Sequence, residues 1–212
     1  MNPTHKTLTL KPVEAIILAA GQSQRMGEPK LVLPWGQTTV IGAVIQALVQ
    51  GGLELGLQGI LVVTGGHRHI IESFLQQYAS PIPLRWTFNP HYEGEMTFSL
   101  QEGLRQTSPT AQAVLIALGD QPQILPSTVH SILKSYQEEG RLLIAPSYQM
   151  RRGHPWLVAR PLWRQLLALE EPHTLRDFFA QYADQVHYIL VETPTILKDL
   201  DTPQDYQREK PA

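Results

Sequence analysis

Residues 13–30 read VEAIILAAGQSQRMGEPK, and the predicted fold is organised around this stretch. The apolar run 15–20 has the length and the β-branched content of a buried strand, and it ends abruptly at Gly21. A polar loop follows that carries Arg25, and Lys30 lies just beyond it. Exposed N–H groups of such a loop and two side-chain cations suit a bound phosphate chain. The stretch therefore predicts a strand that leads into an anion-binding loop.

The spacing of this loop excludes two familiar phosphate-binding motifs. The dinucleotide fingerprint requires G-x-G-x-x-G, and the Walker loop requires G-x-x-x-x-G-K followed by Ser or Thr. The loop has neither pattern. A strand-to-helix turn with solvated basic residues is the structural alternative, and the spacing alone does not separate it from a binding loop.

The rest of the chain alternates between strand and helix patterns. Short apolar runs typical of buried strands lie at residues 60–64, 84–88, 114–118 and 142–145. Apolar residues recur at helical spacing over residues 40–49, 70–78, 96–104 and 129–136. We expect the first of these helices to start at a Thr38 or Thr39 cap and to stop at Gly51 and Gly52. This βαβα order predicts an α/β fold, a Rossmann-like three-layer sandwich with a mostly parallel sheet.

The length and composition predict one domain. At 212 residues and 42% hydrophobic content, the chain is long enough for one well-filled core. After residue 146, further patterns predict a strand at 156–159, helices at 161–169 and 174–182, and a strand at 186–191. We expect a single domain over residues 13–206, between a polar N-terminal extension (residues 1–12) and a C-terminal tail (residues 207–212).

The composition also excludes several classes of partner and site. Lys and Arg number 17 against 19 Asp and Glu, so no broad basic surface for nucleic acid is expected. The chain has no cysteine, which excludes disulfides, thiolate catalysis and zinc–thiolate sites and favours a cytoplasmic location. The apolar run near the N-terminus is too short for a signal peptide or a membrane span. We therefore expect a soluble cytoplasmic protein without a membrane partner.

The ends of the predicted strands share a feature that points to a binding site. Gly21, Gly65, Asn89 and Asp120 all lie at the carboxyl ends of such strands. Ligands of parallel sheets bind outside the carboxyl ends of the strands. These residues are therefore expected to border one cleft.

Two aspartates that follow apolar segments are candidate metal ligands. Asp120 lies in the sequence GDQP, and Asp201 lies in DLDTP near the C-terminus. Each could instead form a turn or cap a helix. Together, however, two carboxylates could hold one Mg²⁺ against phosphate oxygens. Asp199 is a weaker candidate, because it could equally be a solvated partner of Lys198.

The longest motif of the chain carries a family resemblance. Residues 18–36, LAAGQSQRMGEPKLVLPWG, resemble the signature loop of nucleotidyltransferases related to molybdenum cofactor cytidylyltransferase, the MobA-like NTP transferase domain. The family pattern runs L/T-A-A-G-x-S-x-R-M-G-x-x-K-x-x-L-P-W. The resemblance implies the nucleotide-diphospho-sugar transferase type of the predicted fold. It also implies that the loop wraps a nucleotide triphosphate, with Arg25, Lys30 and Asp120 in catalysis and Asp120 and Asp201 as metal ligands.

The same resemblance implies further binding positions. Implied contacts to the nucleotide, besides Arg25 and Lys30, are Leu18, Ala19, Ala20, Gly21, Ser23, Gly27, Gly66 and Asn89. Residues 89–100 resemble the family's N-P-x-Y/W-x-x-G-x-x-x-S-L stretch near the base and the acceptor, and Gly153-His154-Pro155 matches its G-H-P motif. Implied acceptor-binding residues are Gly94, Ser99, Gly153, His154 and Pro155. Without the resemblance, Asn89 would be read as a turn residue, Ser99 as a solvated helix residue and His154 as part of a surface loop.

The function implied by the resemblance is transfer of CMP from CTP to the molybdopterin form of the molybdenum cofactor, with release of pyrophosphate. The implied cofactor is Mg²⁺, with Mn²⁺ as an alternative, and a recipient molybdoenzyme is an implied partner. The methyl group of Ala20 favours a pyrimidine, since related guanylyltransferases begin L-A-G-G. Leu18, however, stands where cytidylyltransferases often have threonine. A GTP-using guanylyltransferase therefore stays open as an alternative.

Other functions also remain open at this point. The acceptor could be a sugar phosphate or another small phosphorylated molecule. A nicotinamide-dependent oxidoreductase is disfavoured by the missing G-x-G-x-x-G pattern. A non-catalytic nucleotide- or cofactor-binding chaperone for a molybdoenzyme is the alternative from another class.

Overall fold

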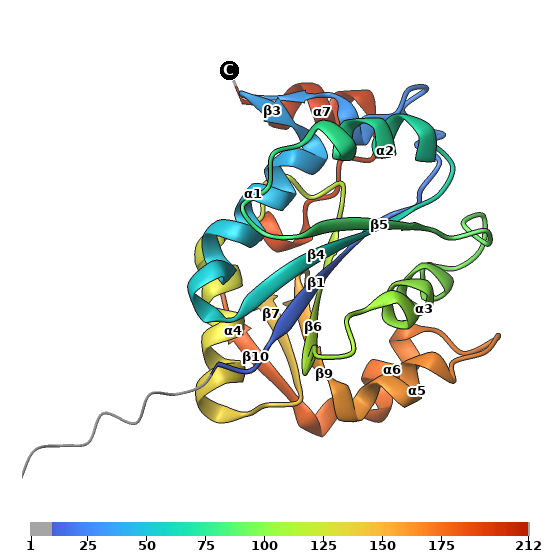
Figure 1. Cartoon of the computed structure of the whole chain (residues 1–212). Coiled ribbons are helices and arrows are strands. Elements are labelled where there is room, and N and C mark those ends of the chain that lie inside the picture. The colour runs from blue at the N-terminus through green and yellow to red at the C-terminus, as the bar shows by residue number, and fades with distance from the viewer. Residues whose placement is uncertain (1–9, 212) are drawn as a thin grey trace, which may run out of the picture.

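The protein consists of a central sheet with helices on both faces (Figure 1). The structure is a computed structural model that describes residues 10–211, so residues 1–9 of the expected N-terminal extension lie outside the described residues. The strands are β1 (Val13–Ala19), β2 (Pro34–Trp35), β3 (Thr38–Thr39), β4 (Leu57–Thr64), β5 (Leu84–Phe88), β6 (Ala113–Leu118), β7 (Leu143–Tyr148), β8 (Arg151–Arg152), β9 (Trp156–Ala159) and β10 (Val186–Leu190). The α-helices are α1 (Val40–Gly52), α2 (Arg68–Gln77), α3 (Met96–Gln106), α4 (Pro126–Glu139), α5 (Trp163–Leu167), α6 (Leu175–Gln181) and α7 (Pro203–Glu209).

The main sheet is mostly parallel, as the sequence predicts. Its strand order is β10-β7-β9-β6-β1-β4-β5, with β8 paired to β7, whereas β2 and β3 form a separate two-stranded ribbon. Strand β1 runs parallel to both of its neighbours, β4 and β6. Strand β9 runs antiparallel to β6 and β7, which the apolar pattern did not predict. The reason is the short connection from β7 to β9, because parallel neighbours need a crossover of a dozen or more residues.

The core lies on both faces of β1. Ala15 and Ile17 pack into one cluster with residues of α1, α2 and α4. Ile16 and Leu18 pack into a second cluster with residues of α3, α5 and α6. Since successive side chains of a strand point to opposite faces, a strand covered on both faces is expected to be apolar on both of them, and in β1 this holds from Ala15 to Ala19. This burial explains the uninterrupted apolar run that opens the chain.

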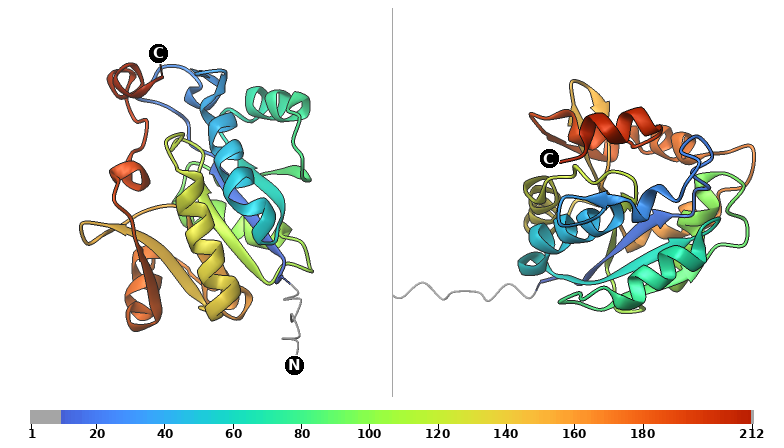
Figure 2. Two further views of the ribbon diagram at one scale, coloured as in Figure 1. Left: turned by 90° about the vertical axis from the view of Figure 1, so that its left-hand side faces the viewer. Right: turned by 90° about the horizontal axis from the view of Figure 1, so that it is seen from above.

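Helix α1 follows the prediction at its start but not at its end. The Oγ1 atom of Thr39 accepts a hydrogen bond from the Gly42 N–H and caps the helix. Gly51 and Gly52 do not stop the helix but lie in its last turn, where α1 packs against α4. A Cβ atom on Gly51 would lie 2.3 Å from the Pro126 carbonyl oxygen, so the missing side chain is needed for this close approach. Figure 2 shows the two helices side by side on one face of the sheet.

The last helix of the structure extends into the residues expected as a C-terminal tail. Helix α7 continues through Glu209, whereas the expected tail begins at residue 207. Its start is fixed by a reciprocal cap in which Thr202 and Asp205 each bond the other's backbone N–H. Over residues 10–211, no helix has the length and apolar character that crossing a membrane requires.

Candidate active site

The loop after β1 forms a compact turn at the carboxyl end of the sheet. The N–H groups of Met26 and Gly27 donate to the Ser23 carbonyl oxygen, and the Lys30 N–H donates to Ser23 Oγ over 3.4 Å. Gly27 has a φ of 73°, a left-handed conformation that favours glycine. The turn therefore brings Arg25 and Lys30 back toward the end of β6, which precedes Asp120.

The two predicted cations and the two predicted metal ligands meet there. Lys30 Nζ lies 2.5 Å from Asp120 Oδ2 and 3.6 Å from Asp201 Oδ1. Arg25 Nη2 lies 3.1 Å from Asp201 Oδ2. The Lys30 side chain is only 12% exposed, so its ammonium is held between the carboxylates. Residues 90 positions apart in the chain thus form one charged centre.

The charged centre opens into a cleft. A cavity of about 440 Å³ is lined by Gln22, Ser23, Gln24, Arg25, Lys30, Tyr92, Glu93 and Asp201. A second cavity of about 330 Å³ is lined by Leu18, Ala20, Gly21, Tyr92, Gly94, Met96, Ser99, Leu118, Asp120, Asp199 and Asp201. Both are lined by Tyr92 and Asp201, so they are two halves of one cleft. The first half contains both cations of the loop together with Glu93 and Asp201, and the second combines an apolar wall with carboxylates.

The donor set of the cleft suits a hard divalent cation. Within residues 10–211, no group of three or more His, Asp or Glu side chains is arranged to hold a metal ion. Asp120 and Asp201 are nevertheless close enough to share Lys30, and both are oxygen donors. Mg²⁺ is commonly bound by one or two carboxylates together with substrate phosphates and water. The two aspartates therefore fit a divalent cation whose remaining ligands would be phosphate oxygens and water.

A third carboxylate, Asp199, also lines the cleft. Burial raises its pKa, and the negative charges of Asp120 and Asp201 act in the same direction. A hydrogen bond from Gln121 Nε2 to Asp199 Oδ1, 2.7 Å long, opposes that shift. Asp199 therefore faces the other aspartates and not Lys198, which pairs with Glu209 at 2.8 Å.

The remaining predicted nucleotide contacts divide into cleft and core positions. Ala19 packs into the core, while Gly66 holds the loop by donating its N–H to the Ala20 carbonyl oxygen. A Cβ atom on Gly65 would lie 2.3 Å from that oxygen and 2.6 Å from Tyr92 Cβ. This glycine is therefore required for the end of β4 to approach both the loop and Tyr92.

Asn89 holds a turn from a buried position. It is 2% exposed, its Oδ1 accepts a hydrogen bond from the His91 N–H, and its Nδ2 donates to Ser99 Oγ. Both of its polar groups are thereby used within the protein. Gly94 and Ser99 line the cleft, and their role in acceptor binding stays a prediction.

Gly153, His154 and Pro155 lie beside the cleft but do not line the two cavities described above. The His154 N–H donates to the Ile196 carbonyl oxygen in the short 3-10 helix η5 (Pro194–Leu197). A Cβ atom on Gly153 would lie 2.2 Å from the same oxygen. The missing side chain of Gly153 therefore leaves room for the backbone of η5. The role of Gly153, His154 and Pro155 in acceptor binding stays a prediction.

His154 predicts a measurable pH dependence of stability. Burial, with a smaller contribution from Arg152, lowers its pKa from 6.5 to about 4. The unfolded chain therefore binds the additional proton between these pH values, and stability falls as the pH drops from about 6.5 toward 4, by on the order of 2–3 kcal/mol. Denaturant titrations of the wild type and of His154→Gln should show the larger loss in the wild type. Parallel curves over this range would contradict the assignment.

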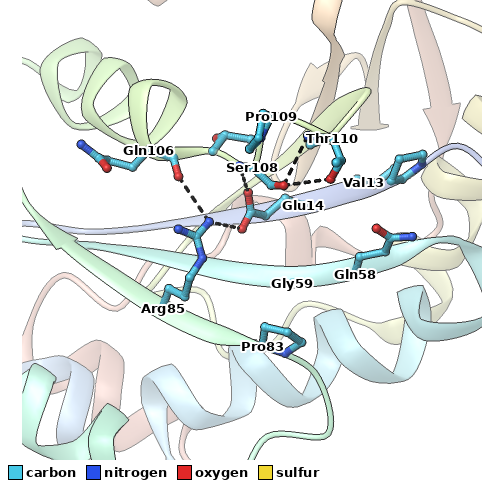
Figure 3. Close-up of a pocket in the computed structure, with 13 residues that line it drawn as sticks. Val13, Glu14, Gln58, Gly59, Pro83, Arg85, Gln106, Ser108, Pro109 and Thr110 are labelled. Carbon is cyan, nitrogen blue, oxygen red and sulfur yellow. Dashed lines mark hydrogen bonds and ion pairs between the residues drawn. The ribbon is translucent and has the colours of Figure 1, made fainter.

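Another cavity, of about 310 Å³, lies at the opposite, amino-terminal edge of the sheet (Figure 3). Its floor is Glu14, whose side chain is 6% exposed. Glu14 Oε1 accepts from Arg85 at 2.6 Å, and Oε2 accepts from the Ser108 N–H at 2.7 Å. Both carboxylate oxygens are thus satisfied, and the group ties β1 to β5 and to the loop after α3.

We expect Glu14→Ala to destabilise the protein without impairing the cleft. The change leaves the Ser108 N–H unpaired and removes the carboxylate from Arg85, which is half-exposed and can be rehydrated. We expect a loss of about 2–3 kcal/mol in the free energy of unfolding. Denaturant unfolding measures this loss, and the reaction rate per folded molecule is the control. An unchanged stability would contradict the structural role.

The cleft residues Tyr92 and Asp199, and the buried Gln121 beside the cleft, are not among the site residues that the sequence predicts. Tyr92 and Gln121 enter the sequence analysis only as members of the motifs 89–100 and GDQP, and Asp199 is there a weaker candidate for a metal ligand. The position of Gln121 directly after Asp120, at the end of a buried strand, was the available signal. Its partners lie 75 and 78 residues away, and no local pattern identifies them.

Comparison with known proteins agrees with this geometry. Residues 15–186 match the model of the MobA-like NTP transferase domain. Molybdenum cofactor cytidylyltransferase of Escherichia coli K12 is 27% identical over 197 residues, which cover 93% of this chain and 95% of that protein. The crystal structure of Rv0371c from Mycobacterium tuberculosis H37Rv has 25% identity and a TM-score of 0.77, covering 94% of this chain and 97% of that one. A nucleotidyl transferase from Methanothermobacter shares the fold, with 24% identity and a TM-score of 0.77 over 94% of this chain and 96% of that one.

The cleft, with its loop cations and paired aspartates, lies within the matched residues except for Asp201 and its neighbours. The chain therefore belongs to the family of the MobA-like NTP transferase domain and is a nucleotidyltransferase.

Proposed function

We propose that this nucleotidyltransferase transfers CMP from CTP to the molybdopterin form of the molybdenum cofactor. The products are pyrophosphate and the cytosine dinucleotide form of the cofactor. The observation that carries the proposal is the meeting of Lys30 with Asp120 and Asp201 in one cleft, next to the glycine-bounded loop. The name of the Escherichia coli relative supports the choice of nucleotide and acceptor.

The reaction is a displacement at phosphorus. An oxygen of the acceptor's phosphate attacks the α-phosphorus of CTP, the bond from that phosphorus to the bridging oxygen breaks, and pyrophosphate leaves with the bonding electrons. Arg25, Lys30 and the N–H groups of the loop bind the β- and γ-phosphates and stabilise the charge on the departing group. No general base is needed, because a phosphate monoester is already ionised at neutral pH.

Asp120 and Asp201 are the residues that would hold Mg²⁺, or Mn²⁺ in its place. When bound, such an ion supplies neutralisation of phosphate charge and orientation of the reacting groups. In the structure these carboxylates are instead neutralised by Lys30 and Arg25. Nucleotide binding therefore requires an exchange of partners in which both cations turn from carboxylates to phosphates.

The choice of base depends on the residues that line the cleft. Leu18 and Ala20 both line the half that also contains Asp120. The methyl group of Ala20 takes space that the first glycine of an L-A-G-G loop would leave free, which favours a pyrimidine over a purine. The threonine of many cytidylyltransferases is absent, so GTP is the second candidate.

The test is pyrophosphate release from CTP, GTP, ATP and UTP with Mg²⁺, each with and without the molybdopterin cofactor. The proposal predicts release from CTP that depends on the acceptor. Release with GTP alone would replace the base assignment and keep the acceptor. Release only with sugar phosphates or other phosphorylated alcohols would overturn the acceptor assignment.

A non-catalytic chaperone that delivers cofactor to a recipient molybdoenzyme, which the sequence left open, is disfavoured by membership of the nucleotidyltransferase family. It would still deliver cofactor after Asp120→Ala, whereas the enzyme would lose turnover. The proposal for the enzyme also includes delivery of its product to a recipient molybdoenzyme. It further includes a cytoplasmic location, which the cysteine-free composition favours.

A further inference from the structure

The C-terminal segment that carries Asp201 crosses the sheet end as a separate strip of chain. We define the crossing segment as residues 194–201, from η5 to Asp201. It is not part of the sheet, so no ladder of strand hydrogen bonds holds it in place. The position of Asp201 relative to Asp120 must therefore come from specific contacts with the neighbouring loops.

Two contacts with the loop after β6 lie next to the charged centre. The Leu200 N–H donates to the Asp120 carbonyl oxygen at 3.1 Å. The second contact joins the residue after Asp120 to the residue before Leu200: Gln121 Nε2 donates to Asp199 Oδ1 at 2.7 Å. Because Asp201 follows Leu200 directly, these two hydrogen bonds set where its carboxylate stands relative to Asp120.

The Gln121 side chain is buried between the loop after β6 and the crossing segment. Its residue exposure is 2%, and its amide also reaches the Ile196 carbonyl oxygen at 3.5 Å. Within the described residues, its Oε1 atom has no hydrogen-bond partner. An unsatisfied buried oxygen costs free energy, which indicates that the donating side of the amide fixes its orientation.

The charges of the cleft explain why such a clamp is needed. Asp120, Asp199 and Asp201 all line the same half of the cleft, where their like charges repel one another. Lys30 and Arg25 contact Asp120 and Asp201, but within residues 10–211 neither forms an ion pair with Asp199. The Gln121 amide is the donor that holds Asp199, and without it repulsion would move the crossing segment away.

We propose that Gln121 is a positioning residue whose side-chain amide clamps Asp199 and thereby holds Asp201 opposite Asp120. The consequence for catalysis rests on the proposed function, in which these two carboxylates serve the nucleotide. The clamp itself is a property of the fold and can be measured without substrate.

The test combines Gln121→Met, which keeps the length of the side chain but removes the amide, with a matched control. Gln137→Met is that control, because Gln137 is also buried and its Nε2 donates to the Lys11 and Leu55 carbonyl oxygens at 2.9 Å, far from the cleft. The first readout is hydrogen exchange of the Leu200 amide in the free protein. The second is the rate of nucleotidyl transfer per folded molecule.

Gln121→Met is expected to accelerate exchange at Leu200 by about tenfold or more and to lower the transfer rate by about 10- to 100-fold, as loss of an outer-shell partner typically does. Gln137→Met should change neither, although it also lowers the unfolding temperature. In a second pair, Asp199→Asn retains an acceptor oxygen for Gln121 and should keep slow exchange at Leu200, whereas Asp199→Leu should not.

Exchange at Leu200 that is as slow in Gln121→Met as in Gln137→Met would overturn the clamp. If the wild type transfers nucleotide to no acceptor, the proposed function fails, and the exchange rates still decide the clamp by themselves.

Discussion

Asp120→Ala is expected to lower the rate of nucleotidyl transfer by on the order of 100- to 1,000-fold, the usual cost of one lost electrostatic contact to a phosphoryl or oxyanion transition state. The carboxylate is one of the two that would face the phosphates, and Lys30 Nζ contacts it at 2.5 Å. Its loss both weakens a cation site and frees Lys30 from its position. The measurement is the single-turnover rate at saturating CTP and Mg²⁺.

The fold should survive this change. The hydrogen bond between Leu200 and residue 120 uses the backbone carbonyl, which alanine retains. Asp184→Ala is the control, since that aspartate is exposed in a short turn away from the cleft. A transfer rate in Asp120→Ala equal to that of the control would remove Asp120 from the mechanism.

Lys30→Met is expected to have two effects of opposite sign. The transfer rate should fall by about 100-fold or more, because a contact to the departing pyrophosphate is lost. Affinity for Mn²⁺ in the absence of nucleotide should instead rise by about tenfold or more, since a unit charge near a protein surface is worth roughly 1–4 kcal/mol at close range. In the wild type the ammonium is held 2.5 Å from Asp120 and 3.6 Å from Asp201 and competes for both carboxylates.

Titration of Mn²⁺ by electron paramagnetic resonance measures this affinity. Lys134→Met is the matched control, because that lysine is exposed on α4. An Mn²⁺ affinity in Lys30→Met that is equal to or weaker than the wild-type value would show that Lys30 does not act as a stand-in for the metal.

The fold could largely be predicted because its strands are buried on both faces. Ile16 and Ile17 are both fully buried although they point to opposite sides, so the apolar run itself identifies a central strand. The antiparallel direction of β9 could not be predicted, because it depends on a short connection and not on the pattern of the strand. The prediction that Gly51 stops α1 was wrong for a similar reason. A side chain is missing there because α4 packs closely against the helix, and the local sequence does not show that contact.

The site could be predicted where function is carried by local sequence. Arg25 and Lys30 lie on the loop after β1, as expected, and the structure brings both into contact with the predicted aspartates, while their roles in catalysis stay predictions. Gln121 could not be assigned from the sequence, because its partner Asp199 belongs to a segment folded back from the other end of the chain. Tyr92 is likewise a cleft residue only because the backbone of Gly65 leaves room for it.

The most direct test of nucleotidyl transfer follows the two ends of a labelled nucleotide. CTP carrying ³²P at either the α- or the γ-phosphate is incubated with the protein, Mg²⁺ and the molybdopterin cofactor, and the products are separated. Transfer of CMP predicts α-label in the acceptor product and γ-label in pyrophosphate. Appearance of γ-label on the acceptor, or of neither label in a new product, would contradict the nucleotidyl transfer proposed for this cleft.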